Sequence, residues 1–138
     1  MGRSSSLINR FRYWNRIYKA YLTSNKSQLS FWHGEPEINP NVNLEFPKAY
    51  HMKFYYKALY SGDYDPNGIP LLNYHGAIGK QYNPIAISQY GLGNYNLYLE
   101  TAKKKFINAF LKSADWHIMN LEKNNFGIYV WMHHFDFE

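Results

Sequence analysis

The segment from residue 81 to residue 99, QYNPIAISQYGLGNYNLYL, constrains the fold most strongly because it contains a well-defined helix start. Asn83 is a preferred capping residue, since its side-chain oxygen can accept a hydrogen bond from a backbone N–H one turn later. Pro84 follows at the first helical position, where the N–H that proline lacks would have no helical partner. The sequence therefore predicts a helix over residues 84–97.

The apolar residues of this predicted helix are spread around its axis, which is typical of a helix buried on most sides. They are Ile85, Ala86, Ile87, Tyr90, Leu92, Tyr95 and Leu97. Gly91 and Gly93 each cost a helix about 1 kcal/mol relative to alanine, so we expect them to permit the close approach of a neighbouring helix. Gln89 and Tyr90 leave two interpretations open, as hydrogen-bonded core groups or as ligand-binding groups.

Three motifs in this half of the chain carry a family resemblance. They are DPNGIPLLNY at residues 65–74, GAIGKQYNPIAISQYGLGNYN at residues 76–96, and FLKSADWHIMN at residues 110–120. In order, spacing and residue type, residues 50–138 resemble the beginning of the C-terminal domain of the D-glucuronyl C5-epimerases. The resemblance implies a mainly α fold, a partial (α/α) toroid or barrel with a few short strands or a hairpin. It also implies that this part of the chain is the start of such a domain, truncated near Glu138.

The function that the resemblance implies is carbohydrate epimerisation, with uronic acid units of an anionic polysaccharide as the substrate. Inversion at C5 removes a proton alpha to the carboxylate and returns one to the opposite face, which requires two acid/base groups. In the family the catalytic tyrosines lie beyond the position equivalent to residue 138. We therefore expect this chain to hold the substrate-binding opening of the domain. The alternative is a non-catalytic glycan-binding or assembly module.

Five residues form the predicted substrate-binding site: Gln81, Tyr82, Asn83, Gln89 and Tyr90. The first three approach a helix N-terminus, where open N–H groups and the helix dipole favour an anion such as a uronate carboxylate. The last two could hydrogen-bond sugar hydroxyls if, as the resemblance implies, their face lines the barrel mouth. Tyr82 is the candidate acid/base residue.

Residues 1–49 are predicted to be a basic helix followed by a linker. The helix, over residues 7–22, has apolar residues at helical spacing. These are Leu7, Ile8, Phe11, Trp14, Ile17, Tyr18 and Tyr21, with Arg10, Arg12, Arg16 and Lys19 as the basic complement. Two interpretations stay open: a surface helix that covers a core, or a helix that binds a membrane surface or a partner. Residues 23–47 form the linker, anchored by Phe31 and Trp32.

The remaining segments are assigned from turn residues and periodicity. Periodicity leaves residues 50–60 open as an extended strand or a short helix, and we favour the extended form. The turn signal at residues 65–68 returns the chain through an extended segment at residues 69–74, which makes a loose hairpin. A second helix is predicted over residues 101–122, capped by Thr101. Alternating side chains then predict a strand over residues 128–137.

Composition narrows the classes of ligand and partner. Fourteen tyrosines, nine phenylalanines and four tryptophans suit a sugar-binding surface, although such rings also fill cores. The net charge of +5 favours an acidic partner. The lysines cluster without a stacking motif, so we expect no nucleic acid. Adjacent His133 and His134 point to opposite faces of a strand, so we also expect no metal and no cofactor.

The sequence contains no cysteine, no signal peptide and no apolar run long enough to span a membrane, which is compatible with a cytoplasmic location. A helix of the buried type without its partner helices would expose apolar surface, so we expect either self-association or a partner that completes the site.

Overall fold

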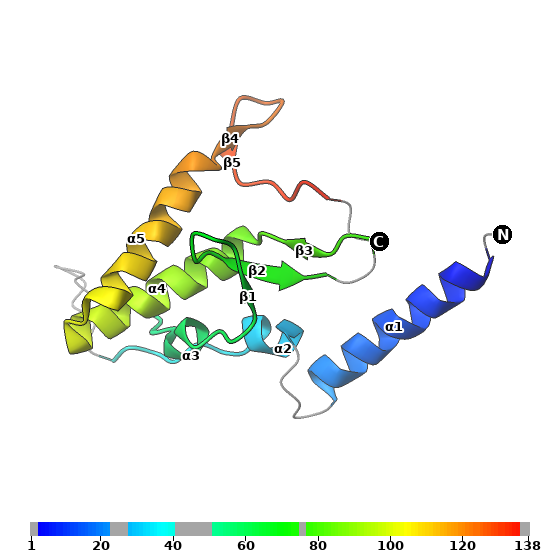
Figure 1. Ribbon diagram of the computed structural model, residues 1–138, viewed down its shortest axis with the longest axis horizontal. Coiled ribbons are helices and arrows are strands. Elements are labelled where there is room, and N and C mark those ends of the chain that lie inside the picture. The colour runs from blue at the N-terminus through cyan, green and yellow to red at the C-terminus, as the bar shows by residue number, and fades with distance from the viewer. Residues whose placement is uncertain (1–2, 23–27, 41–50, 75–76, 136–138) are drawn as a thin grey trace.

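The computed structural model describes residues 3–22, 28–40, 51–74 and 77–135 (Figure 1). Its helices are α1 (Arg3–Tyr21), α2 (Gln28–His33), α3 (Tyr55–Ala58), α4 (Pro84–Thr101) and α5 (Lys104–Met119). Its strands are β1 (Asp63–Tyr64), β2 (Pro70–Asn73), β3 (Lys80–Gln81), β4 (Glu122–Lys123) and β5 (Tyr129–Val130). Among the described helices, none combines the length and apolar character that crossing a membrane requires.

Helices α4 and α5 form a hairpin at the centre of the fold, and Gly91 lets them come together (Figure 1). A Cβ at Gly91 would lie 2.9 Å from the Cβ of Ser113 on α5, closer than such atoms normally approach. Ile87 and Trp116 are buried between the two helices, together with Ile69 from the start of the sheet. The expected close approach at Gly91 is confirmed.

The other glycine of α4 lets the short helix α3 pack against it. A Cβ at Gly93 would lie 2.2 Å from the carbonyl oxygen of Phe54, which has a left-handed backbone conformation with φ 52°. Asn96 holds the chain before Phe54, because its buried amide donates hydrogen bonds to the carbonyls of Met52, at 3.2 Å, and Lys53, at 3.0 Å. The space left at Gly93 and the hydrogen bonds of Asn96 therefore hold α3 against α4.

Lys57 on α3 is only 1% exposed and connects this helix to α2. Its ammonium group donates hydrogen bonds to the carbonyls of Phe31 and Gly34, the second at 3.2 Å. Burial lowers the pKa of Lys57. Trp32 is buried with Tyr60, and Phe31 packs against the same cluster. Both predicted anchors therefore contact the core, but they belong to helix α2 rather than to a loop-like linker.

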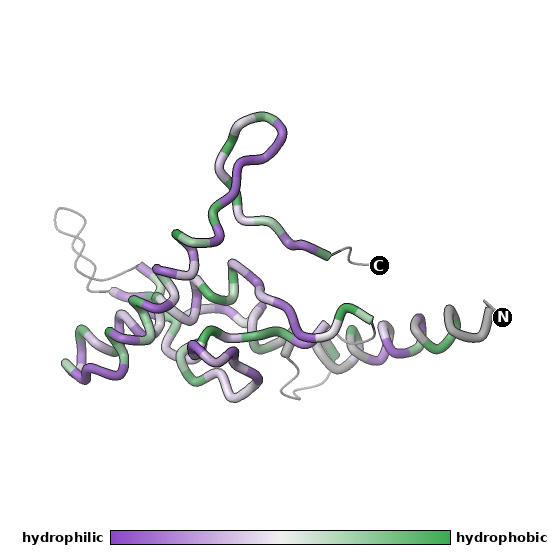
Figure 2. The backbone as a smooth tube through the Cα atoms, turned by 45° about the horizontal axis from the view of Figure 1, so that its top comes forward, coloured by the Kyte–Doolittle hydropathy of each residue, from purple (hydrophilic) through white to green (hydrophobic). Residues whose placement is uncertain are grey.

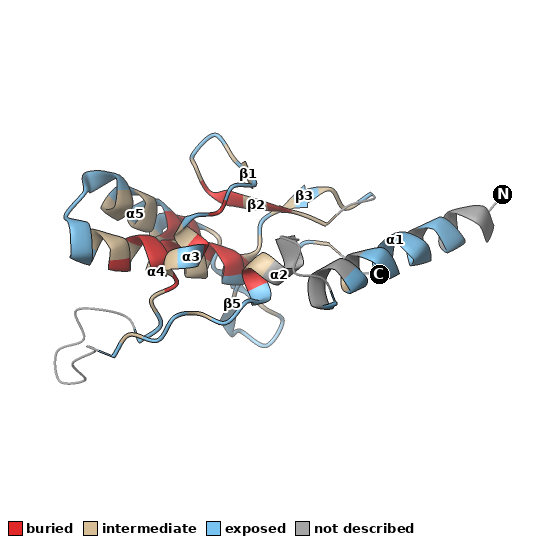
Figure 3. Cartoon of the chain, turned by 90° about the horizontal axis from the view of Figure 1, so that it is seen from below, coloured by how far each residue is buried: buried red, intermediate tan, exposed pale blue. Residues whose placement is uncertain are grey.

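A small antiparallel sheet, in the order β1-β2-β3, lies on another side of α4. Asp63 pairs with Leu71, and Leu72 pairs with Gln81. Figure 3 shows the buried residues gathered on α3, α4 and β2. The predicted extended return at residues 69–74 is confirmed as β2, but its partner is β1 rather than residues 50–60, and β3 leads directly into α4.

The predicted partial (α/α) toroid is wrong. The described residues form one helical hairpin flanked by the short helix α3 and a three-stranded sheet, together with α1, α2 and a separate β4–β5 hairpin. The physical reason lies on α4, whose sides are occupied by α5, by α3 and by β2. In a toroid, further long helices would occupy those positions.

Several predicted boundaries also differ. Residues 50–60 are not uniformly extended, because Tyr55–Ala58 is helical, and Met52 forms an isolated bridge with Ile38. The second helix is shorter than predicted and its N-cap is Lys103, since the Thr101 hydroxyl instead bonds back to the carbonyl of Leu97 at 2.6 Å.

The predicted strand over residues 128–137 is reduced to β5, which pairs with β4. Asn124 makes the connecting turn, because its side-chain oxygen accepts hydrogen bonds from the N–H groups of Phe126 and Ile128. Glu122, predicted to be helical, therefore belongs to this hairpin. Residues 136–138 lie outside the described residues.

Candidate functional site

Asp65 organises the candidate site because its two carboxylate oxygens have different partners. Oδ1 accepts hydrogen bonds from the N–H groups of Asn67, at 2.9 Å, and Ile69, at 2.8 Å, which fixes the turn between β1 and β2. Oδ2 accepts from the hydroxyl of Tyr82 at 2.9 Å. The turn is thereby attached to the start of α4.

Tyr82 presents an aromatic ring and a polar edge to solvent. Its side chain is 39% exposed, and its ring packs against the buried ring of Trp116, with 5.4 Å between centroids. Burial raises the pKa of Tyr82, and the hydrogen bond to Asp65 raises it further. The phenol is therefore a neutral hydrogen-bond and proton donor at physiological pH.

Tyr64, the residue before Asp65, contacts Tyr90. The rings of Tyr64 and Tyr90 lie edge to face, with 5.8 Å between centroids, and the Tyr64 hydroxyl donates to the carbonyl of Tyr60 at 2.6 Å. Burial raises the pKa of Tyr64, and Tyr90 raises it further. Adjacent residues on β1 and its turn thus contact two of the predicted site residues.

A positively charged side chain, that of Lys112, lies beside this turn. Lys112 on α5 has its ammonium nitrogen 3.8 Å from the position that a Cβ on Gly68 would take. Gly68 itself is held at φ +85° in the Asp65 turn. In the described part of the chain, no carboxylate lies within salt-bridge distance of Lys112. Its charge is available to an anionic ligand.

The side chains of Gln81 and Asn83 form hydrogen bonds within the protein. The Gln81 amide donates to the carbonyl of Ile78 at 2.8 Å. The Asn83 side-chain oxygen accepts from the N–H of Ala86 at 3.0 Å, and its amide donates to the Tyr74 hydroxyl at 2.7 Å. The prediction that Asn83 caps a helix starting at Pro84 is confirmed. Their role in binding a ligand stays a prediction.

Gln89 is half-buried, and its side-chain oxygen has no hydrogen-bond partner among the described residues. It is therefore not a fully satisfied core group. The interpretation of Gln89 as a ligand-binding residue stays open, whereas Tyr90 packs against the core cluster around Tyr60.

One polar cluster was not predicted from the sequence. His117 on α5 has its Nε2 2.8 Å from the Ser88 hydroxyl and 3.1 Å from the carbonyl of Pro84, and its Nδ1 lies 2.7 Å from the carbonyl of Ser113. Trp131 donates to the His117 carbonyl at 2.8 Å. Backbone carbonyls orient this imidazole, which attaches α5 to the first turn of α4.

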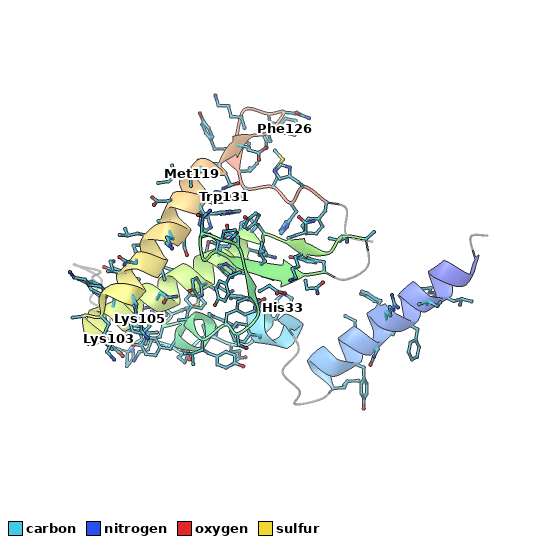
Figure 4. All side chains as sticks on the ribbon, viewed as in Figure 1. His33, Lys103, Lys105, Met119, Phe126 and Trp131 are labelled. Carbon is cyan, nitrogen blue, oxygen red and sulfur yellow. The ribbon has the colours of Figure 1, made fainter. Side chains whose placement is uncertain are left out.

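The ends of α5 have different side chains. Figure 4 shows Met119 and Trp131 near its C-terminal end, and Lys103 and Lys105 near its N-terminal end.

His134 pairs with Glu122 at 2.8 Å on the separate hairpin. In the described ranges, no group of three or more His, Asp or Glu side chains could hold a metal ion.

Comparisons with known proteins do not identify a family. No family model matches the chain, and neither the curated proteins nor the solved structures include a detectable match. The resemblance to the D-glucuronyl C5-epimerases therefore stays a prediction, based on the three motifs at residues 65–74, 76–96 and 110–120.

The signals for the missed residues differ in strength. The sequence marks Asp65 as the first residue of a turn, but it does not indicate that the second carboxylate oxygen accepts a hydrogen bond from Tyr82. Lys112 was one of several lysines on a predicted helix, and nothing local marked it as the one next to the turn.

Proposed function

We propose that this chain binds the uronic acid units of an anionic polysaccharide at the β1–β2 turn and the start of α4. The observation that carries the proposal is the Tyr82–Asp65 hydrogen bond, which attaches an exposed aromatic ring to the turn that contains Gly68. Lys112, which forms no salt bridge among the described residues, lies next to Gly68. The three motifs that resemble the epimerase family support the same class of ligand.

Each part of the arrangement suits one part of a uronate. The exposed face of Tyr82 can cover the C–H face of a pyranose ring, while Trp116 packs behind it and keeps it in place. Lys112 can form a charge-assisted hydrogen bond with the carboxylate at C5. The Asp65 carboxylate can accept a hydrogen bond from a sugar hydroxyl in addition to the one from Tyr82.

Epimerisation at C5 is the reaction that the resemblance favours, and Tyr82 is its acid/base candidate in this chain. A neutral phenol can return a proton to C5, but removal of the first proton needs a base on the opposite face. The raised pKa of Tyr82 keeps its phenol protonated, so Tyr82 does not supply that base. We therefore propose glycan binding as the function of this chain, with turnover dependent on a further acid/base group.

Binding is tested by titrating a glucuronate-containing oligosaccharide in a calorimeter against the wild type and two variants. Lys112→Gln removes a charge-assisted hydrogen bond, so affinity should fall about 10- to 150-fold. Tyr82→Phe keeps the ring and removes the hydroxyl, which should weaken binding about 2- to 10-fold.

Two controls make this experiment specific. Lys105→Gln removes the same charge from the N-terminal end of α5, about two turns before Lys112, and should leave affinity within about twofold (Figure 4). Reduction of the ligand's carboxylates to alcohols should remove the difference between wild type and Lys112→Gln. If Lys105→Gln weakens binding as much as Lys112→Gln, a general charge effect replaces the proposed site.

Turnover is measured separately by incubating the oligosaccharide with the protein in deuterated water. We expect no deuterium at C5, because the described site supplies a donor and no opposing base. Incorporation of deuterium that Tyr82→Phe abolishes would instead establish epimerase chemistry at this residue.

A further inference from the structure

We infer that α1 binds the surface of a membrane rich in anionic phospholipid, lying along it with one apolar face among the headgroups. This inference does not depend on the proposed glycan site. Helix α1 contacts α2 and stands clear of the α4–α5 hairpin and the sheet (Figure 1). The exposed side chains of Leu7, Phe11, Trp14 and Tyr18 can therefore meet another surface.

One face of α1 carries large apolar side chains in contact with solvent. Leu7, Phe11, Trp14 and Tyr18 recur at intervals of four, three and four residues, which places them on one side of a helix. Phe11 is 74% exposed and Trp14 is 62% exposed. Figure 3 shows the described part of α1 as exposed, and Figure 2 shows hydrophobic and hydrophilic stretches alternating along it.

The charge of this helix determines which surface fits. Residues 3–22 contain four arginines and one lysine, and no aspartate or glutamate. Arg10 and Arg12 are both exposed, and they lie on either side of the stripe that Leu7, Phe11, Trp14 and Tyr18 form. Positive charge beside an apolar stripe is complementary to anionic headgroups above an acyl boundary.

Other occupants of this face fit less well. A second copy of α1 would bring two helices with only positive charges together, and the repulsion would oppose their pairing. A soluble polyanion would use the arginines but leave the apolar face in water. Trp14 and Tyr18 are instead the side-chain types that concentrate at the headgroup level of a bilayer, where the ring is buried and the polar atom is hydrated.

The test is co-sedimentation of the full chain with phosphatidylcholine vesicles, with and without phosphatidylglycerol. We expect binding to the anionic vesicles, weakened by high salt. Phe11→Ser should reduce the partition coefficient roughly 10- to 100-fold through lost apolar burial. The double variant Arg10→Gln/Arg12→Gln should reduce it roughly 25-fold, about fivefold for each charge.

Matched controls come from other exposed positions. Phe126→Ser removes an exposed phenylalanine from the β4–β5 hairpin, and Lys103→Gln/Lys105→Gln removes two charges near the N-terminus of α5. Both should bind vesicles within about threefold of the wild type. All of these substitutions are at exposed side chains, so they leave the buried core unchanged.

Several results would overturn the inference. These are no binding to anionic vesicles, equal binding to neutral vesicles, or binding that the arginine substitutions weaken and Phe11→Ser does not. A dimer that Phe11→Ser dissociates, without vesicle binding, would assign this face to a second copy instead. Loss of vesicle binding with intact oligosaccharide binding would leave the proposed function unaffected.

Discussion

Asp65 illustrates how much a single residue contributes to this structure. One carboxylate oxygen stabilises the turn through two backbone N–H groups, and the other holds the Tyr82 hydroxyl. A turn residue and a site residue that are distant in the sequence are thereby coupled. The negative charge at Asp65 also contributes to the raised pKa of Tyr82, after burial.

The first prediction separates these two contributions. Asp65→Asn retains an oxygen acceptor for the turn and removes the charge, so the pKa of Tyr82 should fall toward its ordinary value of 10.0 while the fold stays intact. The measurement is a titration of tyrosine Cζ carbons by NMR. Asp63→Asn, at a carboxylate that pairs with Lys80, is the control and should leave Tyr82 unchanged. An unchanged pKa in Asp65→Asn would contradict the observed hydrogen bond.

At the scale of the element, the local signals predicted α4 well and α3 poorly. Asn83 and Pro84 define the start of α4 by chemistry confined to one turn. Helix α3 depends instead on the left-handed Phe54, on the Asn96 amide and on the buried Lys57, which come together only in the folded chain. Periodicity along residues 50–60 does not decide between a strand and a short helix.

The candidate site divides in the same way. Tyr82 could be selected from the sequence because it precedes a helix start, whereas Asp65, Tyr64 and Lys112 reach it from β1, its turn and α5. Spacing along the chain does not encode these contacts. The wrong prediction of a toroid has the same origin, since periodicity describes the face of a helix but not the element that will cover it.

The second prediction concerns the close packing of α3 on α4. Gly93→Ala would improve helix propensity by about 1 kcal/mol, yet its Cβ would lie 2.2 Å from the Phe54 carbonyl oxygen. The obstacle is backbone, so we expect a net loss of about 1 to 3 kcal/mol in the free energy of unfolding. Urea denaturation measures this loss. Asn108→Ala, at an exposed position of α5, should be neutral or slightly stabilising.

At the scale of the whole molecule, the exposed apolar surface is not where the sequence suggested. Helix α4 is covered by α5, α3 and β2, and its exposed large apolar side chains are Ile85 and Leu99, at opposite ends of the helix. Large apolar side chains are exposed instead on α1 and around the C-terminal end of α5. The second group consists of Ile118, Met119, Phe126, Ile128 and Tyr129.

This second group gives the last prediction, which concerns self-association. Phe126 is 88% exposed, and it shares the β4–β5 hairpin with Ile128, beyond the end of α5 that carries Ile118. Exposed apolar groups that gather in one region favour association, because contact with a second copy removes them from water. We therefore expect the sedimentation coefficient to rise with protein concentration. The double variant Ile118→Ser/Phe126→Ser should suppress that rise, while Phe11→Ser on α1 should not. A wild-type chain that sediments as a monomer at high concentration would show that this surface does not drive association.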